Sequence, residues 1–287
     1  MAKNQEIQAQ TLKIPKVILL TAKIFQAIST KLVTRFAAKL FTTPIKHKIP
    51  KREFTMEQQS IQENLLIPSI NKEIVVYHYG TSEKKILLVH GWSGRGTQLI
   101  KIADELLNLG YSTISFDAPA HGKSKGNSTI MIEFIASILA VEKQFGPFEF
   151  AIGHSLGGMS ILNAIREHLN VKKAVIIGSG DLIHDIIDDF VKKLGLKPEI
   201  GKQLKNHFER KYGSPMNYYS SSVAAKDCTT PVLIIHDEND EEVNVKSAYH
   251  IHETIKNSEL MITKNLGHRK ILGSTEVIKR IIEYIKE

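Results

Sequence analysis

The sequence of 287 residues predicts an α/β fold in which a mostly parallel central sheet is covered by helices on both faces. Short apolar runs alternate with longer amphipathic runs, which is typical of strand–helix–strand crossover units. Runs such as Ile86–Val89 and Val232–Ile235 are apolar at every position, as expected of strands buried between two helical layers. One long interval, about residues 181–226, contains no strand-like run, so we expect a helical insertion there.

The first 52 residues carry the net positive charge. They hold eleven Lys or Arg and one acid, Glu6, a net charge of +10, whereas the rest of the chain has a net charge of −2. Nucleic-acid binding needs a clustered basic face, so the main body is not expected to bind nucleic acid. Charges recur too often between Val17 and Phe41 for a transmembrane helix, and no cleavage pattern of a secretory signal follows Val17–Leu20.

Residues 1–52 are predicted to be a basic, amphipathic helical segment that ends at Thr42-Thr43-Pro44 and continues as a linker. Ser29 is a suitable helix N-cap, so both one long helix and two short helices fit the sequence. The segment either lies on an anionic membrane surface or packs on the main domain with its lysines in solvent. The apolar stripe drifts around the helix, which favours packing on the domain.

Residues 53–287 are predicted to form the main domain, with seven strands and five helices outside the insertion. The strands are expected at Glu73–His78, Lys85–His90, Ser112–Asp117, Glu149–His154, Ala174–Gly178, Val232–Asp237 and Glu259–Thr263. The helices are expected at Thr97–Leu109, Thr129–Phe145, Ser155–Leu169, Lys246–Ile255 and Ser274–Ile285.

The insertion at about 181–226 is expected to contain helices Leu182–Leu194 and Lys202–Tyr212 and to act as a lid over one end of the sheet. Its apolar residues recur at helical spacing, which suits an acyl-chain pocket or, slightly more, the ordinary buried face of a helix. These residues are Leu182, Ile183, Ile186, Ile187, Phe190 and Val191.

A serine between glycines marks the candidate nucleophile. Gly153-His154-Ser155-Leu156-Gly157 is a G-x-S-x-G pattern between a predicted strand and a predicted helix. Small flanking residues allow a strained turn that exposes the Ser155 hydroxyl, and the unpaired N–H groups of the helix that follows face an oxyanion.

Five segments occur in an order that resembles the α/β-hydrolase superfamily of lipases, esterases and serine aminopeptidases. They are "LLVHGWSGRG", "FDAPAHGKS", "IGHSLGG", "VLIIHDENDEEV" and "NLGHRK", and the resemblance spans roughly residues 73–287. It implies an α/β-hydrolase fold and a nucleophile, acid and base that follow one another along the chain in that order.

The resemblance places the base at His268, in the loop after the last predicted strand, and the acid at Asp240. Asp237 stands where the family usually has a glycine, and a carboxylate so close to its strand is not expected to reach the base loop. The remaining acids of this loop are expected to be solvated. His90, His154 and His236 each end a predicted strand, and we expect them to shape the site.

The oxyanion formed in acyl transfer needs two N–H donors. One is expected to be the backbone of Leu156, immediately after the nucleophile. His90-Gly91-Trp92 resembles the family's H-G-x loop, which assigns the second donor to the backbone N–H of Trp92. Gly91 would allow the backbone to approach the substrate carbonyl.

The sequence therefore predicts a serine hydrolase that cleaves a carboxylic ester of a small-molecule acyl substrate through an acyl-enzyme. Thioesterase, aminopeptidase and acyltransferase activities fit the same residues, as does a lipid hydrolase held at a membrane surface by residues 1–52. A non-catalytic interaction protein is the least favoured reading. No cofactor and no metal are expected, and the oligomeric state stays open. The single cysteine, Cys228, cannot form an internal disulfide, and we expect a cytoplasmic protein, in peripheral contact with a membrane under the lipid-surface alternative.

Overall fold

The computed structural model describes residues 14–287, in which the strands form one eight-stranded sheet of order β1-β2-β4-β3-β5-β6-β7-β8. β1 is antiparallel to β2, and β2 to β4, whereas all the other neighbours are parallel. The mostly parallel sheet predicted from the sequence is confirmed. The strands are β1 (Ile61–Ile67), β2 (Lys72–Tyr79), β3 (Lys85–Val89), β4 (Ser112–Asp117), β5 (Phe150–His154), β6 (Lys173–Ile177), β7 (Val232–Asp237) and β8 (Ser258–Thr263).

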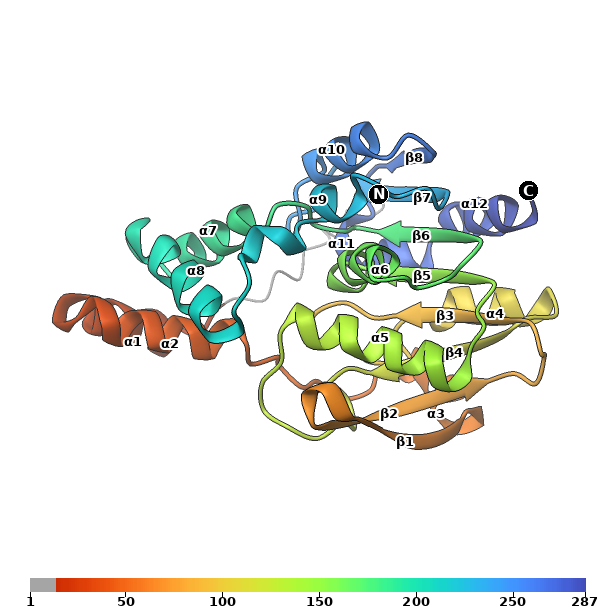
Figure 1. The fold of residues 1–287 in the computed structure, drawn as a ribbon, viewed down its shortest axis with the longest axis horizontal. Coiled ribbons are helices and arrows are strands. Elements are labelled where there is room, and N and C mark those ends of the chain that lie inside the picture. Colours follow the sequence, from red (N-terminus) through yellow and green to blue (C-terminus); the bar gives the residue numbers. More distant parts are fainter. Residues whose placement is uncertain (1–13) are drawn as a thin grey trace, which may run out of the picture.

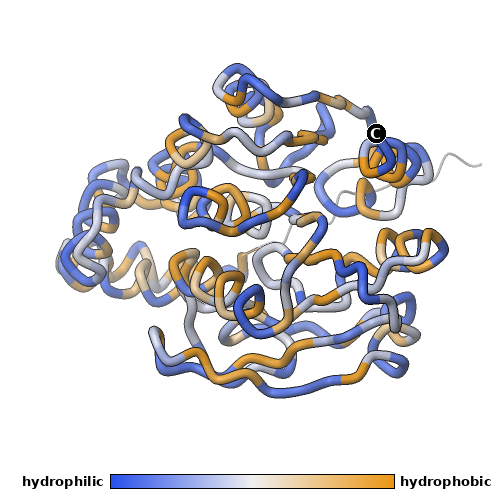
Figure 2. The backbone as a smooth tube through the Cα atoms, turned by 45° about the vertical axis from the view of Figure 1, so that its right-hand side comes forward, coloured by the Kyte–Doolittle hydropathy of each residue, from blue (hydrophilic) through white to orange (hydrophobic). Residues whose placement is uncertain are grey.

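Helices cover both faces of the sheet, and successive strand residues pack against opposite layers. Leu87 and Val89 belong to one buried cluster and Ile86 and Leu88 to the other, as the two-residue period of a strand requires. The first cluster is covered by α5 (Met131–Phe145), α6 (Leu156–Arg166) and α10 (Lys246–Thr254), and the second by α3 (Phe54–Gln59), α4 (Ile100–Asn108) and α12 (Thr275–Lys286). Hydrophobic and hydrophilic stretches alternate along the helical parts of the backbone (Figure 2).

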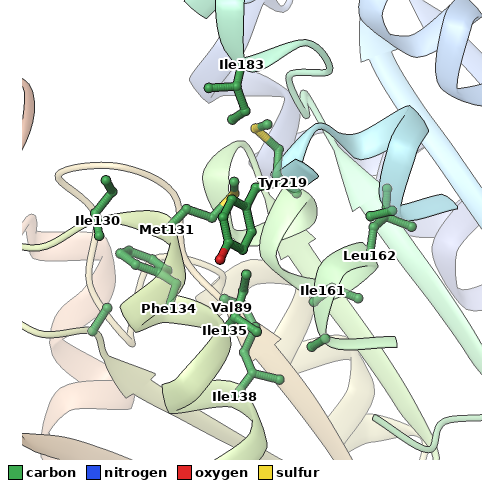
Figure 3. Close-up of a cluster of buried hydrophobic side chains, with 14 of the residues drawn as sticks. Val89, Ile130, Met131, Phe134, Ile135, Ile138, Ile161, Leu162, Ile183 and Tyr219 are labelled. Carbon is green, nitrogen blue, oxygen red and sulfur yellow. The ribbon is translucent and has the colours of Figure 1, made fainter. Parts of the chain in front are cut away.

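The insertion between Gly180 and Lys226 is helical and lies beyond the carboxyl ends of the central strands (Figure 1). It consists of α7 (Ile183–Lys193), α8 (Glu199–Tyr212), one turn of 3-10 helix (Met216–Tyr219) and α9 (Ser221–Ala225), and is called the cap below. Ile183 and Tyr219 of the cap join the buried cluster formed by α5, α6 and the end of β3 (Figure 3). The cap is therefore packed onto the main domain through a shared apolar core.

The N-terminal segment forms two helices, α1 (Lys16–Ile28) and α2 (Thr30–Phe41), and the Ser29 hydroxyl caps the second by accepting the N–H of Leu32 at 3.4 Å. One face of this hairpin is buried on the cap. Phe41 packs edge-on against Phe190 of α7, with the two ring centroids 5.1 Å apart. The segment therefore forms two short helices, one of the two arrangements that fit the sequence, and its second helix packs on the cap. Within residues 14–287 none of the helices has both the length and the apolarity to cross a membrane.

The predicted elements lie within about three residues of the observed ones, but the sequence analysis missed an edge strand. β1 runs over Ile61–Ile67 and only Ile67 in it is buried, so neither an alternating nor a continuous apolar run marks it. β1 is held by its backbone pairing with β2 over seven residues, and its side chains carry no pattern from which the strand could be predicted. The short helices α3 and α11 (Gly267–Lys270) were missed as well.

Candidate active site

Ser155 occupies a strained turn between β5 and α6. Its backbone has φ 53° and ψ −121°, a conformation that side-chain-bearing residues rarely adopt. Its N–H donates to the carbonyl of Ile177 at 2.8 Å, and its own carbonyl accepts the N–H of Gly158 at 3.0 Å. These bonds fix the turn, and residue Ser155 stays partly exposed beyond the carboxyl end of β5.

Three glycines make this turn sterically feasible. A Cβ at Gly157 would lie 2.3 Å from the carbonyl oxygen of Val89, and one at Gly153 would lie 2.7 Å from the backbone of Gly157. A Cβ at Gly91 would come within 2.9 Å of Cβ of Ser155. Carbon atoms do not approach so closely, so each position excludes a larger residue. The Gly91 contact also places the β3 loop directly against the candidate nucleophile.

His268 and Asp240 form a buried pair. Nδ1–H of His268 donates to Oδ2 of Asp240 at 2.7 Å, which leaves Nε2 of the imidazole as the nitrogen available to accept a proton. The other oxygen of Asp240 accepts the backbone N–H groups of Glu242 at 2.8 Å and Val243 at 2.9 Å. Burial by itself would raise the pKa of Asp240, but hydrogen bonds from His236 and His268 lower it well below the usual value. The carboxylate is therefore ionised and fixed in orientation.

The serine and this pair lie at the carboxyl ends of adjacent strands. Ser155 follows β5 and bonds to the last residue of β6, Asp240 follows β7 and His268 follows β8. Gly178, next to Ile177, has φ 59°, and a Cβ there would lie 3.3 Å from Nδ1 of His268. Ser155 and His268 share no hydrogen bond among the described residues. Hydrogen bonds between catalytic groups are often long in the absence of substrate and shorten when it binds.

The carboxylate of Asp237 reaches the base loop, so the expectation that it would not was wrong. The side chain is fully buried. Its carboxylate accepts the N–H of Gly267 at 2.9 Å, the N–H of Leu266 at 3.0 Å and the hydroxyl of Thr263 at 2.8 Å. Burial would raise the pKa of Asp237, yet these bonds lower it below its usual value. Asp237 thus anchors the loop that carries His268, and it is not a solvated loop residue.

Two neutral histidines hold the loop after β3. His90 donates through Nδ1 to the carbonyl of Gly91 at 2.7 Å and accepts the N–H of Ala118 through Nε2 at 3.0 Å. His121 accepts the N–H of Ser93 at 3.0 Å. Burial lowers the pKa of His90 to about 4 and that of His121 to about 2, so neither is protonated near neutral pH.

The backbone N–H groups of Trp92 and Leu156 have no hydrogen-bond acceptor among residues 14–287. Trp92 lies in the loop held by these histidines, and Leu156 is the first residue of α6, whose N–H points out of the helix. Both amides therefore retain an N–H donor that no described residue uses.

His154, immediately before the serine, supports the base loop. Its Nε2–H donates to the backbone carbonyl of His268 at 2.8 Å, and the two rings lie 4.6 Å apart between centroids. Burial, reinforced by the nearby His268 ring, lowers the pKa of His154 well below the usual value. A neutral His154 thus connects the turn of the serine to the main chain of the predicted base.

The burial of His90 predicts a pH-dependent contribution to stability. An unfolded histidine has a pKa of about 6.5, so between that value and about 4 the unfolded chain binds more protons than the folded chain. The contribution is fully present above about pH 6.5, is lost as the pH falls towards 4, and amounts to about 3 kcal/mol. Thermal unfolding from pH 7.5 to 4.5 should show a steeper loss for the wild type than for His90→Asn.

The comparison of variants is needed because the pKa values of other buried groups also shift on folding. Burial raises the pKa of Glu53 and of Asp117, which makes the folded state gain stability as the pH falls. These carboxyl groups are present in both proteins and cancel in the difference. Parallel pH profiles for the wild type and His90→Asn would contradict the assignment.

Two models of known protein families match parts of the chain. The model described as alpha/beta hydrolase fold matches residues 84–210, and the model described as TAP-like protein matches residues 201–287. No curated protein matches the chain. Among residues 14–287 no group of three or more His, Cys, Asp or Glu is arranged to hold a metal ion.

Solved structures with a similar fold include an esterase from Pyrococcus furiosus, with 17% identity and a TM-score of 0.64. The matched region covers 85% of this chain and 96% of the esterase chain. An esterase from Exiguobacterium antarcticum has 21% identity and a TM-score of 0.61, and the matched region covers 79% of this chain and 100% of the esterase chain. A bromoperoxidase from Bacillus anthracis has 19% identity and a TM-score of 0.62, with the same coverages of 79% and 100%. At these identities the likeness establishes the fold.

Proposed function

Because the chain belongs to the α/β-hydrolase superfamily, we propose that it is a serine hydrolase that cleaves a carboxylic ester through an acyl-enzyme intermediate. The observation that carries the proposal is the 2.7 Å bond between His268 and the buried Asp240, beside the strained turn of Ser155. A serine hydroxyl is a weak nucleophile until a base removes its proton, and this pair leaves Nε2 of His268 free to do so.

In the proposed reaction, the Ser155 oxygen attacks the ester carbonyl while Nε2 of His268 takes the hydroxyl proton. Asp240 stabilises the imidazolium, and the N–H groups of Trp92 and Leu156 donate to the carbonyl oxygen as it becomes negative. Collapse of this intermediate breaks the ester C–O bond, and His268 protonates the departing alcohol. Water then attacks the acyl-enzyme by the same route, which releases the acid and restores Ser155.

The site residues support nucleophilic acyl transfer and do not by themselves select an ester. Superfamily members with the same residues also cleave thioesters or amides at peptide N termini or transfer acyl groups, and a fold does not choose among substrates. The cap is proposed to be the lid that shapes the acyl pocket. Ile186 of α7 supports an apolar acyl group, because it lies beside Gly180 and Met159 just beyond the end of β6.

Labelling with a fluorophosphonate probe tests the proposal. The wild type is expected to be labelled on Ser155, as located by peptide mass spectrometry, and to hydrolyse p-nitrophenyl acetate, butyrate and octanoate. A parallel panel of acyl thioesters and aminoacyl amides ranks the alternatives by kcat/KM. A folded protein that the probe leaves unmodified, and that is inactive on the whole panel, would leave only the non-catalytic alternative.

A further inference from the structure

The helix α1 has an apolar face that the described part of the chain does not cover. Val17, Leu20, Ile24 and Ile28 are 68%, 60%, 48% and 68% exposed. They recur at intervals of three or four residues and so form one stripe along the helix. The opposite side of α1, which carries the fully buried Ala22, packs against α2, and the side chain of Gln26 accepts the N–H of Lys197 in the cap at 2.7 Å. The helix is therefore apolar on two sides, and only one of them is accounted for by folding.

The α1–α2 hairpin carries cations and no acid. Lys16 and Lys23 lie along one edge of the apolar stripe by helical periodicity. On α2, Lys31, Arg35 and Lys39 follow one another at intervals of four residues and are exposed. No Asp or Glu occurs between residues 14 and 52, so nothing within this stretch neutralises these charges.

A basic groove lies where α2 meets α8. It has a volume of about 540 Å³, and its lining includes Lys31 and Arg35 from α2 and His207 and Arg210 from α8. Burial and the charges of Lys211, Arg210 and Arg35 lower the pKa of His207. Cations facing one another across a groove repel, and a bound anion would relieve that repulsion.

We propose that the α1–α2 hairpin docks the protein on an anionic lipid bilayer. The exposed stripe would enter the interface between headgroups and acyl chains, and the flanking cations and the groove would contact the anionic headgroups. A second copy of the chain would bring the same uncompensated cations against the surface. Nucleic acid would satisfy the cations but leave the apolar stripe in water. Only an anionic bilayer satisfies both features.

Docking in this manner would turn the cap towards the bilayer, because α1 and α2 lie with α7 and α8 beyond the strand ends where Ser155, Asp240 and His268 are placed (Figure 1). The inference does not depend on the proposed ester hydrolysis, since it concerns a different surface and is read out by binding.

The test is co-sedimentation of the full chain with vesicles of phosphatidylcholine alone and of phosphatidylcholine with 30% phosphatidylserine. We expect binding to the anionic vesicles that weakens as salt rises from about 0.05 to 0.5 M. Leu20→Ser/Ile24→Ser should lower the partition coefficient about tenfold or more. Lys31→Gln/Lys39→Gln should lower it and flatten its salt dependence.

Matched variants elsewhere serve as controls. Ile61→Ser/Leu66→Ser removes two exposed apolar side chains from β1, and Lys279→Gln/Lys286→Gln removes two exposed cations from α12. Both should bind vesicles like the wild type, and circular dichroism should show that all variants are folded. The proposal would be overturned if the wild type did not bind anionic vesicles, or if Leu20→Ser/Ile24→Ser bound them equally well. It would also be overturned if light scattering showed a dimer that this variant abolishes.

Discussion

Replacing Ser155 with alanine is expected to lower kcat for p-nitrophenyl butyrate by about 10³-fold to 10⁶-fold and to abolish labelling by a fluorophosphonate. The substitution removes the attacking oxygen and leaves the turn in place, because the backbone bonds of residue 155 to Ile177 and Gly158 do not involve the side chain. Steady-state kinetics with each purified protein would measure the change, and KM should change much less than kcat.

Ser128→Ala is the matched control for Ser155→Ala. Ser128 is exposed, and its backbone carbonyl accepts the hydrogen bond from Lys72, so its hydroxyl is not involved. This variant should keep the wild-type rate. Equal rates for Ser155→Ala and the wild type would mean that the hydrolysis does not pass through Ser155, and the proposed mechanism would then be wrong.

The sequence was sufficient for the parallel part of the sheet and insufficient for its edge. β4 and β7 were predicted at their observed bounds, and both are buried at every position; β7 begins with four apolar residues, as expected of a strand covered on both faces. β1 was missed because its stability comes from pairing with β2 and from position, which a single strand's residues do not encode.

In the candidate site, too, features encoded by neighbouring residues were predicted, and a contact between distant segments was not. The positions of Ser155, Asp240 and His268 were predicted from motifs whose residues are close in sequence. The anchoring by Asp237 was not predicted, because its donors Leu266 and Gly267 lie about thirty residues further along the chain. Only the pairing of β7 with β8 brings that loop within reach.

The exposed stripe on α1 shows a further limit of pattern analysis. An amphipathic pattern predicts that one face of a helix is buried, and Ala22 fulfils this. The same pattern does not predict that a second apolar side of the helix, with Leu20 and Ile24, is exposed to solvent. That result needed the three-dimensional packing of the hairpin on the cap.

Replacing Asp240 with asparagine should distinguish the role of Asp240 from that of Asp237, the other buried carboxylate after β7. An amide at residue 240 can still accept the N–H groups of Glu242 and Val243, but it presents N–H or a neutral oxygen to His268. The imidazole then loses the partner that fixes its tautomer and stabilises its charge, and kcat is expected to fall about 10⁴-fold with the fold intact. The measurement is kcat on p-nitrophenyl butyrate together with the midpoint of thermal unfolding.

Asp237→Asn is expected to show the opposite balance. The carboxylate of Asp237 accepts N–H groups of Asn239, Leu266 and Gly267 and the hydroxyl of Thr263, and a neutral amide cannot accept all of them. Donors left unpaired in the interior should lower the free energy of unfolding by about 1–3 kcal/mol, whereas kcat should fall less than in Asp240→Asn because the base keeps its own partner. If Asp240→Asn kept a tenth of the wild-type rate while Asp237→Asn lost nearly all of it, the acid would be Asp237. The direct bond between Asp240 and His268 would then be structural, so these two variants decide which carboxylate supports the base.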